Sequence, residues 1–121
     1  MVDQLPEAII DPSGQYKYIQ ILVTHKETGE SKLFVRGYKS CPYHMIIMEK
    51  FQNEELNQIE NSNLYQAECP GGGRIEHNPD SKKLFIYGYS QSYGQPEHAK
   101  AQAILQRAYP DYEVTWSNEG Y

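Results

Sequence analysis

His44 is the residue of this sequence best placed to do chemistry. It follows Pro42 and Tyr43 and directly precedes the apolar run at residues 45–48. Because proline favours the first position of a helix, we expect a helix to begin at about Pro42. The unpaired backbone N–H groups of a helix start hold anions such as phosphate, and they disfavour a protonated imidazole. A neutral His44 beside such an anion site could act on a phosphoryl group as a general base or as a nucleophile. The alternative is a structural or surface histidine.

Three cationic side chains could neutralise a phosphoryl group held near His44. Lys17 lies in a segment rich in Tyr and Ile, and Arg36 lies in the next apolar segment. Arg74 directly follows the glycines at residues 71–73. The guanidinium group of an arginine offers two parallel donors that match phosphate oxygens. Taken singly, each cation could instead be a solvated side chain or one partner of a surface ion pair.

The segment at residues 89–94, Tyr-Ser-Gln-Ser-Tyr-Gly, could complete an anion site. Ser90 and Ser92 supply hydroxyl donors, and the glycine lets backbone amides turn toward a ligand. Pro96 follows, where we expect a second helix to begin. The alternative interpretation is an ordinary connection between a strand and a helix.

Residues 69–74, Cys-Pro-Gly-Gly-Gly-Arg, resemble two phosphate-binding motifs without matching either. The Gly-Lys-Ser/Thr ending of a nucleotide-binding P-loop is missing. The segment is also one residue shorter than the Cys-x5-Arg loop of cysteine phosphatases, so its amides could not surround phosphate in the same way. We interpret residues 70–73 as a tight structural loop that leaves Arg74 at its exit. A cysteine phosphatase with Cys69 as nucleophile remains the alternative.

The other titratable residues give weaker signals. We expect His25, His77 and His98 to face solvent, and Glu54 and Glu55 to lie on a solvated helix face. Neither cysteine belongs to a Cys-x-x-C pair, and no Cys/His spacing matches a zinc site. No Asp-x-Asp or His/Asp cluster suggests bound magnesium. We therefore expect no metal and no cofactor.

Hydrophobic periodicity indicates an α/β fold in a single domain over residues 1–121. Alternation predicts a strand at residues 16–24, in which Lys17, Ile19 and Ile21 share one face while Tyr16 and Tyr18 share the other. The expected first helix covers residues 42–59 with a buried stripe at Tyr43, Ile46, Ile47, Lys50 and Phe51. The other expected elements are strands at 31–38, 64–69, 74–77, 82–88 and 112–116 and a second helix at about 96–108. We expect them to form one mixed sheet of about six strands, flanked by the two helices.

Composition excludes several classes of protein. The chain has 121 residues with 39% hydrophobic and 22% charged residues, which is ordinary for a globular domain. Its formal net charge of −5 argues against a broad nucleic-acid-binding face. No apolar run approaches membrane-spanning length, and the first residues lack the pattern of a secretion signal. We expect a cytoplasmic monomer that binds neither nucleic acid nor membranes.

Several segments, taken in order along nearly the whole chain, closely resemble the protein phosphohistidine phosphatase (Janus) family. The segments that carry the resemblance are Tyr-Lys-Tyr at 16–18, Val-Arg-Gly-Tyr-Lys at 35–39, Tyr-His at 43–44, Gly-Gly-Gly-Arg-Ile at 71–75, Tyr-Gly-Tyr-Ser at 87–90 with Tyr-Gly at 93–94, and Tyr-Pro-Asp-Tyr-Glu-Val-Thr-Trp at 109–116. The resemblance implies a metal-independent phosphatase that removes phosphate from phosphohistidine in proteins, with phospholysine as a second candidate substrate.

The resemblance also implies roles for particular residues. His44 matches the catalytic histidine of the family. Residues that match phosphoryl-binding or nearby positions are Lys17, Arg36, Tyr43, Arg74, Ser90 and Ser92. Ser92 stands where the family often has alanine, so only its backbone N–H is implied. Residues 40–42, Ser-Cys-Pro, stand where relatives commonly have an aromatic and an acidic residue, which bears on substrate preference. The rival interpretation is a non-enzymatic module that binds phosphorylated or acidic partners through the same pocket.

Overall fold

A six-stranded mixed sheet organises the protein, in a computed structural model that describes residues 2–120. The spatial order is β1-β3-β2-β4-β5-β6. Its strands are β1 (Ala8–Ile10), β2 (Gly14–His25), β3 (Ser31–Gly37), β4 (Tyr65–Asn78), β5 (Lys83–Tyr87) and β6 (Glu113–Ser117). The two outermost pairs, β1 with β3 and β5 with β6, are parallel, and the inner pairs are antiparallel. The expected α/β class with a mixed six-stranded sheet is confirmed.

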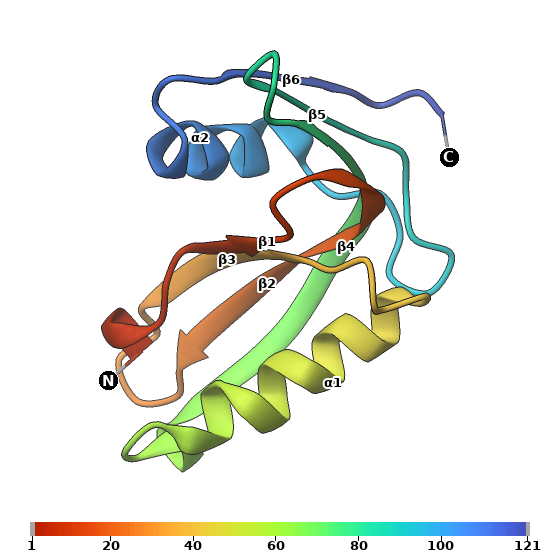
Figure 1. Ribbon diagram of the computed structural model, residues 1–121. Helices are drawn as coiled ribbons and strands as arrows, with labels where there is room; N and C mark the ends of the chain where they lie inside the picture. The colour runs from red at the N-terminus through yellow and green to blue at the C-terminus, as the bar shows by residue number, and fades with distance from the viewer. Residues whose placement is uncertain (1, 121) are drawn as a thin grey trace.

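Two helices cover the sheet, α1 (His44–Glu54) and α2 (His98–Ala108). Figure 1 shows them on either side of β2 and β3. Three short 3₁₀ helices complete the fold at Val2–Gln4, Leu56–Gln58 and Ser62–Leu64. Within the described residues, no helix combines the length and apolar character needed to cross a membrane.

The alternation along β2 divides the core into two halves, as the sequence predicts. Ile19, Ile21 and Val23 pack in the half that includes Ile47 and Phe51 of α1. Tyr16 and Tyr18 belong to the other half, together with apolar residues of α2. Because successive side chains of a strand point to opposite faces, Lys17 shares the α1 face with Ile19. This parity brings the ammonium group of Lys17 to the same side of the sheet as the start of α1.

The prediction of a loop at residues 70–73 is wrong. β4 is one continuous strand of 14 residues that runs through the three glycines. One extra residue is accommodated where the register shifts opposite Gln20 and Leu22, as in a β-bulge. The glycines allow close approach: a Cβ on Gly72 would lie 2.7 Å from Cδ2 of His44, and one on Gly73 would lie 2.2 Å from the carbonyl oxygen of Tyr87. Composition alone favours a turn here, and tertiary packing decides otherwise.

The first helix is shorter than predicted, and its buried stripe is different. Pro42 precedes the helix, Tyr43 is the N-cap residue, and His44 is the first helical residue. The buried residues of α1 are His44, Ile47, Met48 and Phe51. This spacing of three, four and seven residues is that of one helix face. Tyr43 and Ile46, expected to be buried, are 66% and 38% exposed.

The second helix also begins after its proline, at His98 rather than Pro96. His98 and His77, expected to face solvent, are buried at 1% and 2% exposure. His77 lies between the backbone oxygen of Asp11 and the hydroxyl of Tyr112, at 2.8 and 3.1 Å. Two satisfied ring nitrogens explain how a polar imidazole is accommodated in the core.

Candidate active site

A small cavity of about 60 Å³ lies at the N-terminal end of α1. Its lining residues come from β2, the start of α1 and the segment between β5 and α2, and they are Lys17, Tyr43, His44, Gln91 and Ser92. Four of the five lining residues, all except Gln91, are site residues predicted from the sequence.

The orientation of His44 is fixed by the glycine segment of β4. Its Nε2 lies 3.0 Å from the carbonyl oxygen of Gly73. A carbonyl oxygen can only accept, so Nε2 carries the hydrogen and donates it. The ring carbon Cδ2 packs against Gly72. The Nε2–Cδ2 edge of the ring thus faces β4, and Nδ1, on the other edge, keeps its lone pair when the ring is neutral.

The environment of His44 favours this neutral form. Burial lowers the pKa of its imidazole below the ordinary value of 6.5, and the positive charges of Lys17 and Arg74 lower it further. The hydrogen bond to Gly73 acts in the opposite direction and raises the pKa. The net shift is downward, so the ring is uncharged at neutral pH. An uncharged ring with a free nitrogen is the form that can accept a proton or attack a phosphorus atom.

Lys17 and Arg74 form a cationic pair across two strands. They are direct partners in the antiparallel register of β2 and β4, so both side chains lie on the α1 face of the sheet. The ammonium of Lys17 lies 5.8 Å from the ring centroid of Tyr43. Arg74 does not line the cavity, but its charge is close enough to act on the pKa of His44.

The segment at residues 90–94 closes the cavity as a tight loop. Ser90 and Gly94 exchange two backbone hydrogen bonds, and the Oγ of Ser90 accepts the N–H of Tyr93 at 3.1 Å. The N–H of Gly72 binds the carbonyl oxygen of Gly94 at 3.3 Å, which ties the loop to β4. Ser90 is 1% exposed, so it organises the loop, whereas Ser92 is exposed and lines the cavity.

The structure does not bring Arg36 to this cavity. Its guanidinium is fully buried and forms a two-point ion pair with Glu55, at 2.9 Å from Nε and 2.7 Å from Nη2. Nη2 also donates to the carbonyl oxygen of Pro6. Glu55 directly follows the last residue of α1, eleven positions after His44, which corresponds to about 16 Å along a helix. Glu55, expected on a solvated face, is thus the partner of a buried structural arginine.

Cys69 lacks the properties of a phosphatase nucleophile. Burial raises the pKa of its thiol to about 12. The thiol Sγ donates to the carbonyl oxygen of Gly71 at 3.4 Å. A reactive cysteine needs a stabilised thiolate, and this environment stabilises the neutral thiol. The environment of Cys69, which also does not line the cavity, argues against the cysteine phosphatase alternative.

Two contributors to the site were missed by sequence reasoning. Gln91 lines the cavity, and the carbonyl oxygen of Gly73 orients the imidazole of His44. The position of Gln91 between two serines was a usable signal. A backbone carbonyl leaves no signal in residue type, and the expectation of a loop at 70–73 concealed its role.

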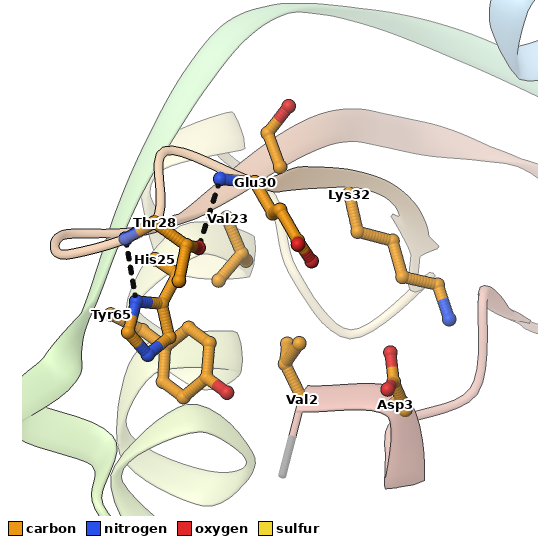
Figure 2. Close-up of a pocket in the computed structure, with 9 residues that line it drawn as sticks. Val2, Asp3, Val23, His25, Thr28, Glu30, Lys32 and Tyr65 are labelled. Atoms are coloured by element: carbon orange, nitrogen blue, oxygen red, sulfur yellow. Dashed lines mark hydrogen bonds between the residues drawn. The ribbon is translucent and has the colours of Figure 1, made fainter.

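A larger cavity of about 230 Å³ lies elsewhere, beside the hairpin between β2 and β3. Figure 2 shows Val2 and Asp3 on one side of it and His25, Tyr65, Glu30 and Lys32 around the other. His25 lies eight residues beyond Lys17 on β2, which corresponds to about 26 Å along a strand. The charges that line this cavity are two carboxylates and one ammonium, an arrangement that does not favour a phosphate dianion.

Comparison with known proteins identifies the family of this chain. The family model of the Janus/Ocnus family matches residues 2–113. The chain is 45% identical to the sex-regulated protein janus-A of Drosophila pseudoobscura pseudoobscura over 122 residues, which cover 98% of this chain and 78% of the relative. It is 43% identical to the janus-A protein of Drosophila melanogaster over 118 residues, 97% of this chain and 82% of the relative. It is 41% identical to the human 14 kDa phosphohistidine phosphatase over 122 residues, 97% of this chain and 94% of the relative. This chain belongs to the Janus/Ocnus family.

Proposed function

We propose that this protein is a phosphohistidine phosphatase that hydrolyses the P–N bond of phosphohistidine in other proteins and releases inorganic phosphate. The observation that carries the proposal is the tautomer of His44. Its Nε2 is committed to Gly73, so a neutral ring has an unprotonated Nδ1, and His44 lines a cavity together with Lys17. The 41% identity to a human protein named as a phosphohistidine phosphatase supports the same activity.

In the proposed reaction, the cations hold the substrate and His44 activates water. Lys17 and Arg74 neutralise the phosphoryl oxygens, and the backbone N–H groups of Gln91 and Ser92 and of the first residues of α1 add donors, since those of Ser90, Tyr93 and Gly94 are bonded within the loop. Tyr43 gives this helix start no side-chain cap. Nδ1 of His44 accepts a proton from the attacking water, the O–P bond forms and the P–N bond breaks. When the leaving imidazole carries a proton on its other nitrogen, it departs as neutral histidine with the bonding electron pair.

The same geometry permits a second route, in which Nδ1 of His44 itself attacks phosphorus. The P–N bond of the substrate would break and a new P–N bond to His44 would form, to be hydrolysed by water in a second step. Rapid quenching in alkali distinguishes the two routes, because phosphohistidine is stable in alkali and a phosphorylated His44 would survive for detection. Labelled phosphate on His44 during turnover supports the second route, and its absence in single turnovers supports the first.

The test of the proposal is phosphate release from a phosphohistidine protein in the presence of a chelator. We expect turnover by the unaltered protein and a loss of at least about 10²–10⁴-fold in His44→Ala. His44→Gln is the matched control for structure because its amide can still donate toward Gly73, yet it has no basic nitrogen. Both variants should keep the circular dichroism of the native fold. Activity retained by His44→Ala would remove His44 from catalysis, and activity lost on chelation would contradict a metal-independent reaction.

A binding module without turnover is the second candidate function. The janus-A relatives carry names that describe sex-regulated proteins and state no activity. In this case the protein would bind phosphohistidine peptides in the cavity and release no phosphate from them. Measuring binding and release on the same peptide decides between the two, and a phospholysine peptide in the same assay tests the second candidate substrate.

A further inference from the structure

A third cavity, of about 300 Å³, lies along α1. Its lining residues come from α1, the segment after it and the loop at 90–94, and they are Met45, Met48, Glu49, Gln52, Asn53, Asn57 and Tyr93. We refer to these seven residues as the α1 groove. The α1 groove and the His44 cavity are built from the same two elements, the start of α1 and the loop at 90–94, since Met45 directly follows His44 and Tyr93 directly follows Ser92.

The α1 groove carries a single charged side chain. Glu49 is exposed, and its charge is close enough to Tyr93 to help raise the pKa of that phenol, after burial and Cys69. Among the described residues 2–120, no lysine or arginine forms an ion pair with Glu49. The carboxylates that follow on the same segment, Glu54 and Glu55, do have partners, Lys50 and Arg36. Glu49 therefore offers a negative charge to an external cation.

Around Glu49, the α1 groove presents apolar surface that is unusual for the outer face of a helix. Met45 is 51% exposed, and the neighbouring Ile46 is 38% exposed. Methionine is flexible and polarisable, so it adapts to different apolar partners. Three further lining side chains, Gln52, Asn53 and Asn57, are amides, which can bind a backbone.

We propose that the α1 groove binds the segment of a substrate protein that flanks its phosphorylated residue, with a lysine or arginine of the substrate at Glu49 and an apolar side chain against Met45. This inference rests on the proposed function and specifies its substrate class. Glu49 lies five positions after His44, which corresponds to a rise of about 7.5 Å along the helix axis. An extended peptide covers that length in about two to three residues, so the cationic residue stands about that far from the phosphohistidine.

Charge complementarity distinguishes this occupant from an acidic one. The His44 cavity is positive because of Lys17 and Arg74, and a basic flank on the substrate would be repelled there. Glu49 supplies the compensating negative charge a short distance along the helix. Specificity then comes from charge placement within one continuous surface.

The test uses three phosphohistidine peptides of equal length that carry Lys, Gln or Glu at the flanking positions, with phosphoramidate as a substrate that has no flank. We expect the unaltered protein to have the highest kcat/KM on the Lys peptide. In Glu49→Lys, the ratio of kcat/KM for the Lys peptide to that for phosphoramidate should fall about fivefold, and the ratio for the Glu peptide should rise. Glu60→Lys is the matched control because Glu60 is exposed and lies outside the α1 groove.

Each outcome of this experiment has one meaning. If the unaltered protein has the same ratio of kcat/KM, relative to phosphoramidate, for all three peptides, the proposed role of the α1 groove is wrong. The proposed function would remain intact. A Glu49→Lys change that lowers phosphoramidate and Lys-peptide hydrolysis to the same degree would reveal a general field effect and would also overturn it. No phosphate release by the unaltered protein from any substrate would contradict the proposed function itself.

Discussion

The Nε2 nitrogen of His44 and the carbonyl oxygen of Gly73 lie 3.0 Å apart, and this contact decides which imidazole nitrogen is free. The contact spans 29 residues of sequence and joins the first turn of α1 to β4. The strand that supplies the carbonyl also supplies Arg74, the next residue. One strand thus orients the imidazole of His44 and places a positive charge close enough to act on its pKa.

The acid limb of the pH–rate profile should report the titration of His44. Because its pKa is lowered, we expect the rate to fall only as pH drops below 6.5, when Nδ1 becomes protonated. Lys17→Met removes one of the charges that lower this pKa, so the midpoint should move upward. Titration of His44 by NMR in both proteins measures the shift directly. Lys26→Met, an exposed lysine at the far end of β2, is the control and should leave the midpoint in place.

Gly72→Ala should displace the imidazole of His44. The new methyl group would lie 2.7 Å both from Cδ2 of His44 and from the backbone oxygen of Tyr18, and the oxygen cannot move without distorting β2. We expect a large loss of phosphate release together with a lower melting temperature. Ile86→Val, in the other half of the core, costs about 0.5–1.5 kcal/mol and serves as the control for destabilisation alone. Full activity in Gly72→Ala would show that the position of the ring is not critical.

Glu55→Ala should destabilise the fold and spare the chemistry. The substitution leaves the guanidinium of Arg36 buried without its carboxylate, which costs about 3–5 kcal/mol. Urea unfolding measures the loss, and kcat/KM measured below the unfolding transition should match that of the unaltered protein. A selective loss of phosphate binding in this stably folded variant would return Arg36 to the active site.

Stability should fall as pH drops below 6.5 because of two buried histidines. Burial lowers the pKa of both His44 and His98, whereas in the unfolded chain both titrate near 6.5. Below 6.5 the unfolded chain binds protons that the native state does not, so the free energy of unfolding decreases as pH falls toward the lowered values. Above 6.5 this contribution is constant. Urea unfolding at several pH values tests the sign, and His98→Gln should reduce the slope.

The fold was largely predictable because it depends on patterns that sequence displays. Alternation along β2 predicts its two faces, and these faces decide that Lys17 lies on the side of α1. The glycine segment was not predictable in the same way, since glycine is typical of turns and only the positions of His44 and Tyr87 explain a strand there. The burial of His77 and His98 was not predictable for a related reason. It depends on hydrogen bonds with residues distant in the sequence.

For the candidate site, residue types in the sequence identified most of the side chains that line the cavity. His44, Lys17, Tyr43 and Ser92 do lie around one cavity. Arg36 shares the chemistry of a phosphate ligand, and only the position of Glu55 reveals that its side chain is already occupied. Sequence identifies which groups can bind phosphate, whereas the register of the sheet determines which of them are available.

The glycine segment of β4 has a mechanical consequence. The N–H of Gly72 holds the loop at residues 90–94, and the carbonyl of the adjacent Gly73 holds the imidazole of His44. Two consecutive residues of an extended strand are about 3.8 Å apart at their Cα atoms, a spacing that covalent geometry does not let vary. A motion of the sheet that displaces β4 therefore moves the imidazole of His44 and the loop at residues 90–94 together, because the two glycines that hold them are joined covalently.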